Sequence, residues 1–276
     1  VIVNFYPFEK VLQKTKNHSK IIENIDIGGP AMVRAAAKNY ESVSVITNIN
    51  QYLDFVDEIK KHNGSTSLKF RQKMSEQAFM QTAYYDAVIS NYYNKLLQNK
   101  FPKIKLIYGK KIENLRYGEN PHQEAAIYSN KYKFQFKQLS GKKLSYNNYN
   151  DMLSAVTISK SLPKSKGTVI VKHGNPCGIS IKKNKIESFK FALKSDPISA
   201  FGGIVSCNFK IKKKLAILLG KIFFEVIIAN GFDKDALKIL KRKKNLRIID
   251  ANKVSFEDTQ SILSSLNSIL IQSTDL

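Results

Sequence analysis

Apolar positions along the chain follow two alternating patterns. Short runs rich in Val and Ile are separated by longer stretches whose apolar residues recur at helical spacing. The short runs predict strands over residues 1–4, 42–48, 168–171 and 225–230. The longer stretches predict helices over residues 30–39, 51–61, 65–98, 187–194 and 212–223, the third of them as one helix or a helix pair. This alternation is typical of α/β proteins, in which helices cover a sheet.

Glycine, proline and asparagine mark the ends of the predicted helices. The Gly-Gly pair at 28–29 predicts a loop that leads into a helix, because Pro30 is tolerated in a first helical turn. Asn50 can cap the next helix, and the Asn-Gly pair at 63–64 can end it.

Polar segments interrupt the periodic pattern in the second half of the chain. They have the sequences RYGENPHQ (116–123), KHGNPCG (172–178) and SDPISAFGG (195–203). A further polar stretch, LSYNN (144–148), precedes a predicted helix that contains Asp151. Loops with this density of hydrogen-bonding groups often carry binding or catalytic residues.

The length of 276 residues suits about two domains. Short strands return after the Phe-Pro pair at 101–102, so we expect domains over residues 1–108 and 109–276. Hydrophobic residues make up 43% and charged residues 24%, as in ordinary globular proteins, and no apolar run approaches the roughly 20 residues of a membrane span. With two cysteines and no basic-then-apolar leader, we expect a reducing, cytoplasmic setting.

The net charge is strongly positive. Lys and Arg number 45 against 22 Asp and Glu, a formal charge of +23 that is compatible with a Lys-rich nucleic-acid-binding protein. Only five of these cations are Arg, whose planar fork suits phosphate and base recognition better than Lys. The densest clusters, at 212–214 and 241–244, carry no interleaved aromatic residues. We therefore favour compositional drift toward AT-rich codons and expect no specific nucleic-acid partner, with nucleic-acid binding kept as an alternative.

Lys172 and His173 follow a predicted strand and offer a cation beside a near-neutral proton carrier. Adjacent side chains on a strand point to opposite faces, so the pair can serve one site only where the strand has ended. The Asn-Pro pair at 175–176 indicates that it has. The alternative is a surface Lys beside a His whose partners lie in the loop.

A zinc site is a further hypothesis for this segment. His173 followed by Pro-Cys at 176–177 resembles the zinc deaminase pattern of His-x-Glu and a later Pro-Cys-x-x-Cys. Asn175 stands where the Glu would be, and Cys207 is far from any Cys-x-x-Cys partner. We therefore expect no metal and interpret both cysteines as small core residues.

Tyr6, Asp26 and Lys38 form a second candidate set, each near a strand end or on the loop and helix that follow. Ligands collect at the carboxyl ends of strands in open α/β sheets. A Tyr, a carboxylate and a Lys would together handle protons, although each taken singly is an ordinary polar residue. The Gly-Gly pair at 28–29, before a helix N-terminus, is a weakly specific anion site.

Seven motifs, in order along essentially the whole chain, carry a resemblance to a known family. They are NFYPF (4–8), NIDIGGP (24–30), RAAAKN (34–39), RYGENPHQ (116–123), LSYNN (144–148), VKHGNPCG (171–178) and SAFGG (199–203). Together they resemble the bifunctional AICAR transformylase / IMP cyclohydrolase family of purine biosynthesis. No single motif decides this resemblance; the ordered set does.

The resemblance implies a fold and two activities. Residues 1–108 would be the C-terminal part of a methylglyoxal-synthase-like cyclohydrolase domain with connecting helices, and residues 109–276 the first cytidine-deaminase-like α/β unit of the transformylase. The transformylase moves a formyl group from 10-formyltetrahydrofolate to the amine of AICAR, giving FAICAR, and the cyclohydrolase closes FAICAR to IMP with loss of water. The family's transformylase sites lie at a homodimer interface, so we expect the full protein to form a homodimer.

The same match implies site residues. Lys172 and His173 would be the transformylase's catalytic pair, with His173 taking the amine proton and Lys172 stabilising the oxyanion and the leaving nitrogen. Tyr6, Asp26 and Lys38 would be the catalytic residues of the cyclohydrolase. The implied substrate-binding residues are Arg116 and Tyr117 for the AICAR phosphate and ring, Asn148, Phe201, Gly202 and Glu225 for further nucleotide contacts, and Asn4 and Gly28 for the cyclohydrolase pocket.

The chain departs from the family's pattern at both ends. It begins after the family's phosphate-binding N-terminal loops and stops before the second transformylase unit. We therefore expect a fragment with two incomplete sites and little turnover by itself. A monofunctional or decayed formyltransferase remains the second alternative.

Overall fold

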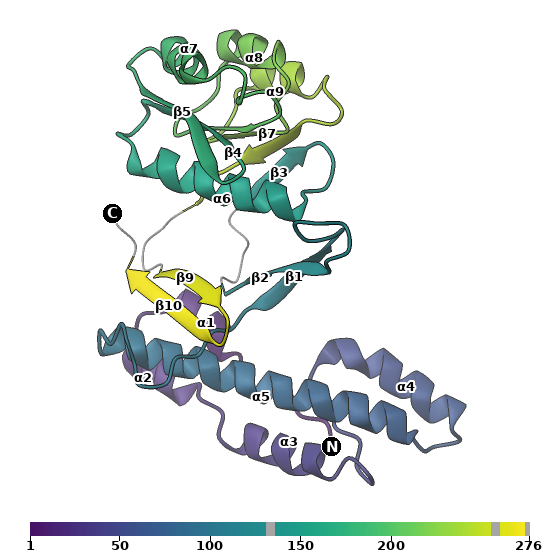
Figure 1. Cartoon of the computed structure of the whole chain (residues 1–276). Helices are drawn as coiled ribbons and strands as arrows, with labels where there is room; N and C mark the ends of the chain where they lie inside the picture. The colour runs from purple at the N-terminus through teal and green to yellow at the C-terminus, as the bar shows by residue number, and fades with distance from the viewer. Residues whose placement is uncertain (131–135, 255–259, 274–276) are drawn as a thin grey trace. The chain divides into compact units, whose positions relative to one another are not determined.

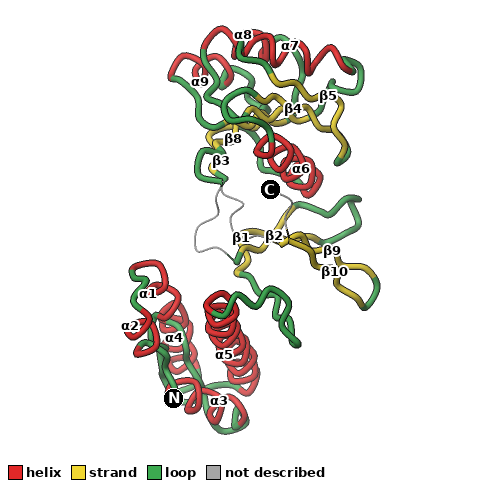
Figure 2. The backbone as a smooth tube through the Cα atoms, turned by 90° about the vertical axis from the view of Figure 1, so that its left-hand side faces the viewer, coloured by secondary structure: helices red, strands yellow, loops and turns green. Residues whose placement is uncertain are grey.

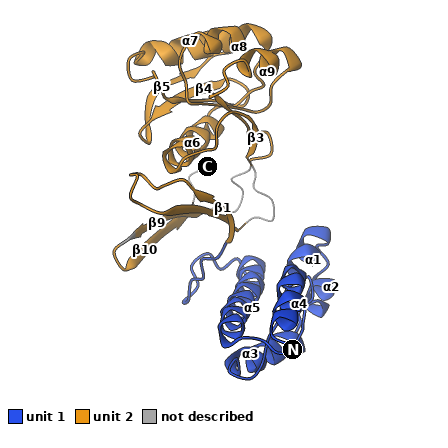
Figure 3. Ribbon diagram, turned by 90° about the vertical axis from the view of Figure 1, so that its right-hand side faces the viewer, with its two compact units in different colours: residues 1–109 blue, residues 110–276 orange. Residues whose placement is uncertain are grey.

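The computed structural model describes residues 1–130, 136–254 and 260–273 (Figure 1). The chain divides into two compact units, Val1–Gly109 and Lys110–Leu276 (Figure 3). This division falls beside the boundary expected near residue 108. Within the described ranges, no helix is long and apolar enough to cross a membrane.

The first unit is mainly helical. Its helices are α1 (Phe8–Lys14), α2 (His18–Glu23), α3 (Gly28–Lys38), the short 3-10 helix η1 (Ile49–Gln51), α4 (Tyr52–Lys61) and α5 (Leu68–Leu96). The predicted helical region at 65–98 forms α5 as a single helix rather than a pair. Ser67 caps α5, because its side chain accepts a hydrogen bond from the backbone N–H of Phe70.

Two separate apolar clusters fix α5 against its neighbours. The first joins α5 to α3 and comprises Val33, Ala36, Ala37, Val45, Ile46, Met74 and Ala78. The second joins α5 to α1 and α2 and comprises Phe8, Ile21, Tyr85 and Val88. Full burial of a large apolar side chain contributes about 1.5–3 kcal/mol. α5 is therefore the element on which α1, α2 and α3 all pack.

The two strands expected in this unit are reduced to one contact. Ile2 and Ile46 form an isolated parallel bridge, in which the N–H of Val3 donates to the carbonyl of Ile46 and the N–H of Ile46 donates to the carbonyl of Val1, each at 2.9 Å. Among the described residues of this unit, no further strand extends the ladder. A two-stranded pair without neighbours is marginal, which explains why the predicted strands stay short.

Two helix starts differ from the prediction. Asn48, not Asn50, caps η1, because its side chain accepts from the N–H of Asn50 while the side chain of Gln51 accepts from the N–H of Asn48. The Gly-Gly pair at 28–29 opens α3 instead of forming a loop, since the carboxylate of Asp26 accepts the N–H of Gly29 at 2.8 Å. In both places an earlier side chain satisfies an amide that would otherwise lack a partner.

The second unit is built on a mixed six-stranded sheet with the order β3-β8-β7-β6-β4-β5. Figure 2 shows the strands of this unit in yellow. Its strands are β3 (Lys137–Ser140), β4 (Gly167–Lys172), β5 (Asn175–Ile181), β6 (Ile204–Cys207), β7 (Val226–Ala229) and β8 (Arg247–Asp250). β6, β7 and β8 run parallel, whereas β4 is antiparallel to β5 and β6, and β3 to β8. The pairs β1 (Lys110–Leu115) with β2 (Ala125–Ser129) and β9 (Gln260–Ser265) with β10 (Ser268–Ser273) form two-stranded sheets. The predicted α/β class is confirmed.

Helices cover both faces of the six-stranded sheet (Figure 1). α7 (Lys185–Ser195), α8 (Lys213–Gly220) and α9 (Lys234–Leu240) pack on one face, and α6 (Tyr146–Ser161) packs on the other. Side chains alternate between the two cores along each strand, so Ile227 faces α7 to α9 while Val226 and Ile228 face α6. Because both faces are buried there, the central strands β4, β6 and β7 are mostly apolar, as the predicted runs were, whereas β3 and β5 at the two edges of the sheet carry exposed polar residues.

The segment after β4 is a tight hairpin and not an irregular loop. His173 and Gly174, with φ of 53° and 74°, join β4 to β5, which begins at Asn175. Two successive residues at positive φ are typical of the two-residue turn that matches the twist of paired strands. Pro176 was expected to lie outside a strand, but β5 is an edge strand, where a missing N–H need not break the ladder.

Candidate active site

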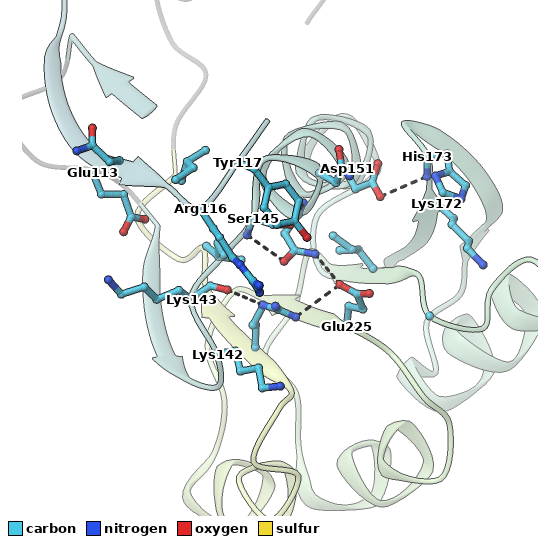
Figure 4. Close-up of a pocket in the computed structure, with 18 residues that line it drawn as sticks. Glu113, Arg116, Tyr117, Lys142, Lys143, Ser145, Asp151, Lys172, His173 and Glu225 are labelled. Carbon is cyan, nitrogen blue, oxygen red and sulfur yellow. Dashed lines mark hydrogen bonds and ion pairs between the residues drawn. The ribbon is translucent and has the colours of Figure 1, made fainter. Parts of the chain in front are cut away.

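A pocket of about 690 Å³ opens at one edge of the six-stranded sheet (Figure 4). At this edge β4 ends and the parallel strands β6, β7 and β8 begin, and the first turns of α6 and the end of β1 complete the wall. Its charged Lys, Arg, Asp and Glu lining residues are Glu113, Arg116, Lys142, Lys143, Asp151, Lys172, Glu225 and Arg247. Five cations against three carboxylates favour an anionic ligand, and the volume suits a small molecule.

The structure brings together most of the residues predicted for formyl transfer. The residues that line the pocket are Arg116, Tyr117, Asn148, Lys172, His173, Gly202 and Glu225. Phe201 is not in the lining: its ring is 60% exposed and lies 5.2 Å from that of Phe223. These residues come from five separate parts of the sequence, so their meeting is a result of the fold. Their roles remain predictions.

Lys172 is the last residue of β4, and its ammonium has a fixed partner. Nζ donates to the backbone carbonyl of Phe201 at 2.8 Å. The next residue, Gly202, has φ of 76° and donates its N–H to the carbonyl of Phe223 at 2.8 Å. Phe201 thus contributes its backbone to the site, because its carbonyl holds the Lys172 side chain in place.

His173 follows Lys172 directly, yet both residues line one pocket. The strict alternation of a strand ends at Lys172, because His173 already lies in the left-handed region at the turn. The sequence argument required the strand to end here, and it does, by a hairpin turn. The N–H groups of His173 and Gly174 both donate to the carboxylate of Asp151 on α6, at 3.3 Å and 2.6 Å.

A chain of polar contacts runs across the floor of the pocket. Asn148 and Ser145 cap α6 reciprocally, and the side-chain amide of Asn148 donates to Oε2 of Glu225 at 2.7 Å. The same oxygen lies 3.5 Å from the guanidinium of Arg247, whose Nε donates to the carbonyl of Lys143 at 3.1 Å. Burial lowers the pKa of Arg247, and the Glu225 carboxylate opposes that shift. The pocket therefore holds Asn148 in one orientation.

The polar segment at 116–123 folds back on itself. The N–H of Gly118 donates to the carbonyl of Gln123 at 2.7 Å, and the Gln123 side chain accepts the N–H of Asn120 at 2.7 Å. The guanidinium of Arg116 lies 5.5 Å from the ring centre of Tyr117. The segment thus places a cation and an aromatic ring in contact with each other.

Several pocket residues were not singled out from the sequence. They are Glu113, Lys142, Lys143, Asp151 and Arg247. Glu113 accepts a hydrogen bond from the hydroxyl of Tyr149 at 2.9 Å. Burial is the main cause that raises the pKa of Tyr149, and the bond to the Glu113 carboxylate raises this pKa further. Two features of the sequence could have pointed to some of these residues. Lys142 and Lys143 directly precede the LSYNN motif, and Arg247 is one of only five arginines.

The first unit holds part of the second candidate set. One carboxylate oxygen of Asp26 accepts the N–H of Tyr6 at 3.2 Å, and the amide of Asp26 donates to the hydroxyl of Tyr85 at 2.9 Å. The Asn4 side chain donates to the hydroxyl of Tyr52 at 2.7 Å. Gly28 begins α3, and no atom lies within 4 Å of the position that a Cβ would take there.

Lys38 lies apart from this group. It ends α3, so a helix of 11 residues places it about 15 Å along the axis from Gly28. Its side chain is exposed. The fold thus brings Tyr6 and Asp26 together and leaves Lys38 at the other end of the helix.

The two cysteines differ in burial. Cys207, on β6, is fully buried, which raises the pKa of its thiol to about 12. Cys177, on β5, is partly buried, and burial raises its thiol pKa as well. In the part of the chain that the structure describes, no group of three or more His, Cys, Asp or Glu residues could hold a metal ion.

Comparisons with known proteins bear on both units. The family described as AICARFT/IMPCHase bienzyme matches residues 36–276. The bifunctional purine biosynthesis protein PurH of Prochlorococcus marinus is 43% identical over 291 residues, covering 100% of this chain and 55% of that protein. PurH of Persephonella marina is 45% identical over 258 residues, with 90% and 50% covered, and PurH of Leptospira biflexa is 44% identical over 279 residues, with 100% and 54% covered. The chain spans about half the length of these curated relatives.

Proposed function

The chain belongs to the AICARFT/IMPCHase bienzyme family, and from that premise we propose that the intact protein is a phosphoribosylaminoimidazolecarboxamide formyltransferase and IMP cyclohydrolase. It would carry out the last two steps of de novo IMP synthesis. In the first, AICAR takes a formyl group from 10-formyltetrahydrofolate to give FAICAR and tetrahydrofolate. In the second, FAICAR closes to IMP with loss of water.

One observation carries the formyl-transfer proposal: Lys172 and His173 stand side by side in the wall of a cationic pocket. Transfer forms a bond between the AICAR amine and the formyl carbon and breaks the bond from that carbon to the folate nitrogen. His173 would take the proton that the amine loses. Lys172, anchored on the Phe201 carbonyl, would stabilise the oxyanion and deliver a proton to the leaving nitrogen.

The remaining pocket residues would bind AICAR. Arg116 and Tyr117 offer a charge for the phosphate and a flat face for the ring, and their 5.5 Å contact supports that pairing. Asn148 and Glu225, joined by a hydrogen bond, would contact the nucleotide's polar edge. Gly202, which lines the pocket, and its neighbour Phe201 would supply the remaining substrate contacts.

For ring closure, Tyr6, Asp26 and Lys38 would transfer protons from the carboxamide nitrogen to the former formyl oxygen, which leaves as water. Asn4 and Gly28 would line the nucleotide pocket. The support is the hydrogen bond between the Tyr6 N–H and the Asp26 carboxylate. The carboxamide nitrogen must attack the formyl carbon, so a proton acceptor held close to the nucleotide is required. The structure leaves Lys38 at the other end of α3, so this support covers Tyr6 and Asp26 alone.

The setting of the reaction follows from the same proposal. The folate is a co-substrate, and neither step needs a metal. We further propose a cytoplasmic homodimer without a specific nucleic-acid partner. The small number of Arg residues and the scattered Lys residues support the last point.

Formyl transfer by the intact protein tests the proposal. Lys172→Ala and His173→Ala should each lower kcat by roughly 100-fold or more, because each removes a group that acts on a transferred proton or developing charge. Lys190→Ala, an exposed lysine on α7, is the matched control and should leave kcat unchanged. Unchanged transfer in the Lys172 and His173 variants would show the assignment to be wrong.

A further inference from the structure

Asp151 lies on α6, and its carboxylate meets the tip of the β4–β5 hairpin (Figure 4). Oδ1 accepts the N–H of Gly174 at 2.6 Å, and Oδ2 accepts the N–H of His173 at 3.3 Å. Asp151 also lines the pocket, and it follows Asn148 by three residues, so both lie on one face of the helix. A single side chain thus holds both amides of the turn that carries His173.

The turn has a reason to need such a partner. His173 has φ of 53°, and positive φ is uncommon for residues with a side chain. In two-residue turns of this type Asn, Asp and Gly are the favoured first residues. The preferences of this turn type therefore do not by themselves explain the conformation of His173. Two hydrogen bonds to a charged carboxylate, which are stronger than bonds between neutral groups, stabilise it.

The same geometry separates Asp151 from proton transfer. Each of its two oxygens already accepts a backbone donor. Backbone amides keep their protons, so the carboxylate is engaged as a fixed acceptor. Its helix is anchored in turn by the Ser145 and Asn148 cap and by the buried side chain of Met152. Asp151 therefore fixes the position of the turn and takes no part in proton transfer.

We propose that Asp151 is a positioning residue for formyl transfer: it holds the turn at 173–174 in the left-handed conformation and thereby keeps the imidazole of His173 beside Lys172. This inference rests on the proposed function. Lys172 depends less on the turn, because its own Nζ is bonded to the Phe201 carbonyl. Loss of the Asp151 contacts should therefore displace His173 and leave Lys172 in place.

Asp233 offers a matched control elsewhere in the same unit. Its carboxylate also accepts two backbone amides, from Ala236 at 2.6 Å and Lys213 at 3.2 Å, but it does not line the pocket. Hydrogen exchange on the 276-residue chain compares the two. Asp151→Asn should speed exchange of the Gly174 amide by roughly 10-fold or more and leave that of Ala236 unchanged, and Asp233→Asn should do the reverse.

Kinetics of the intact protein test the consequence for His173. Asp151→Asn should lower kcat for formyl transfer by roughly 10- to 100-fold with little change in KM for AICAR, since misplacing one catalytic group affects the chemical step. In a His173→Ala background the same change should have no further effect. Asp233→Asn should leave kcat unchanged. If Asp151→Asn does not fold, Asp151→Glu, which keeps the charge and moves the carboxylate by one methylene group, replaces it in the cycle.

The outcomes are separable. If the unaltered intact protein transfers no formyl group, the proposed function fails and this inference fails with it. If transfer occurs and Asp151→Asn lowers kcat equally in the presence and absence of His173, Asp151 acts on the general structure and the inference alone is overturned. Unaltered exchange of the Gly174 amide in Asp151→Asn would overturn it as well.

Discussion

At the scale of single residues, His173 combines a reactive side chain with a backbone conformation that suits other residues better. A substitution at His173 can therefore remove the reactive side chain without lowering the stability of the turn. Asn adopts positive φ readily and is favoured in two-residue hairpin turns. A residue kept against local preference is expected where its side chain has a task.

His173→Asn tests whether stability and activity separate in this way. The variant should unfold at the same urea concentration as the unaltered chain or a higher one, because Asn fits the turn at least as well. Under the proposed mechanism, formyl transfer by the intact protein should nevertheless fall roughly 100-fold or more, since Asn cannot take over the role of proton acceptor proposed for His173. Urea unfolding and a kcat measurement on the same variant check this; a variant that loses stability, or keeps its rate, would contradict it.

Glu225 provides a second prediction at this scale. Its carboxylate is the acceptor for the side-chain amide of Asn148, a residue that is only 5% exposed. Glu225→Ala should cost about 1–3 kcal/mol, because that buried amide loses its partner. Glu225→Gln should cost less than about 1 kcal/mol, since a Gln oxygen can still accept the bond and the 3.5 Å pair with Arg247 is partly exposed. Equal losses of unfolding free energy in urea would refute this.

At the scale of elements, the hairpin of β4 and β5 was one part that local reasoning interpreted incorrectly. The Asn-Pro pair at 175–176 is usually a sign of a loop. Only the place of β5 at the edge of the sheet makes proline acceptable there. Several helices, by contrast, were predicted closely: the region expected at 51–61 forms α4, and that at 187–194 forms α7. Their periodicity depends on nearby residues alone. The short helices α1, α2 and α9 were not predicted.

Gly178 tests how β5 packs on α7. A Cβ at this position would overlap the carbonyl oxygen of Ala192 and lie 2.8 Å from its carbon. Because the obstacle is helix backbone, Gly178→Ala should destabilise the second unit by about 1–3 kcal/mol. Gly220→Ala is the control. No atom lies within 4 Å of the position that its Cβ would take, and alanine has a higher helix propensity than glycine at this last residue of α8. A thermal unfolding midpoint lowered equally by both changes would argue against this packing.

At the scale of the whole molecule, four buried or partly buried tyrosines predict a loss of stability at alkaline pH. Burial is the largest cause that raises the pKa values of Tyr84, Tyr85, Tyr108 and Tyr149. The unfolded chain releases these phenolic protons near pH 10, while the folded chain retains them. Unfolding then releases protons, so stability falls as pH rises above about 10.

This predicts a decline in the urea midpoint as the pH rises from about 10 to about 11.5. Tyr149→Phe should flatten the decline in the second unit, because phenylalanine has no proton to lose. Tyr128→Phe, at a position 58% exposed on β2, serves as the control and should leave the slope as it was. A decline of the same slope in all three proteins would assign it to other groups.

The sequence by itself determined the α/β class and most of the helices that the structure describes, because hydrophobic periodicity depends on neighbouring residues. It also determined the family, because the order of the motifs along the chain can be read without a structure. It placed Lys172 and His173 together, since they are adjacent. Only the tertiary structure decided what surrounds them. Asn148 meets Glu225 across 77 residues of sequence, and Arg247 reaches the Lys143 carbonyl across 104. These meetings depend on the strand order of the sheet, which helical crossovers set and no local pattern encodes.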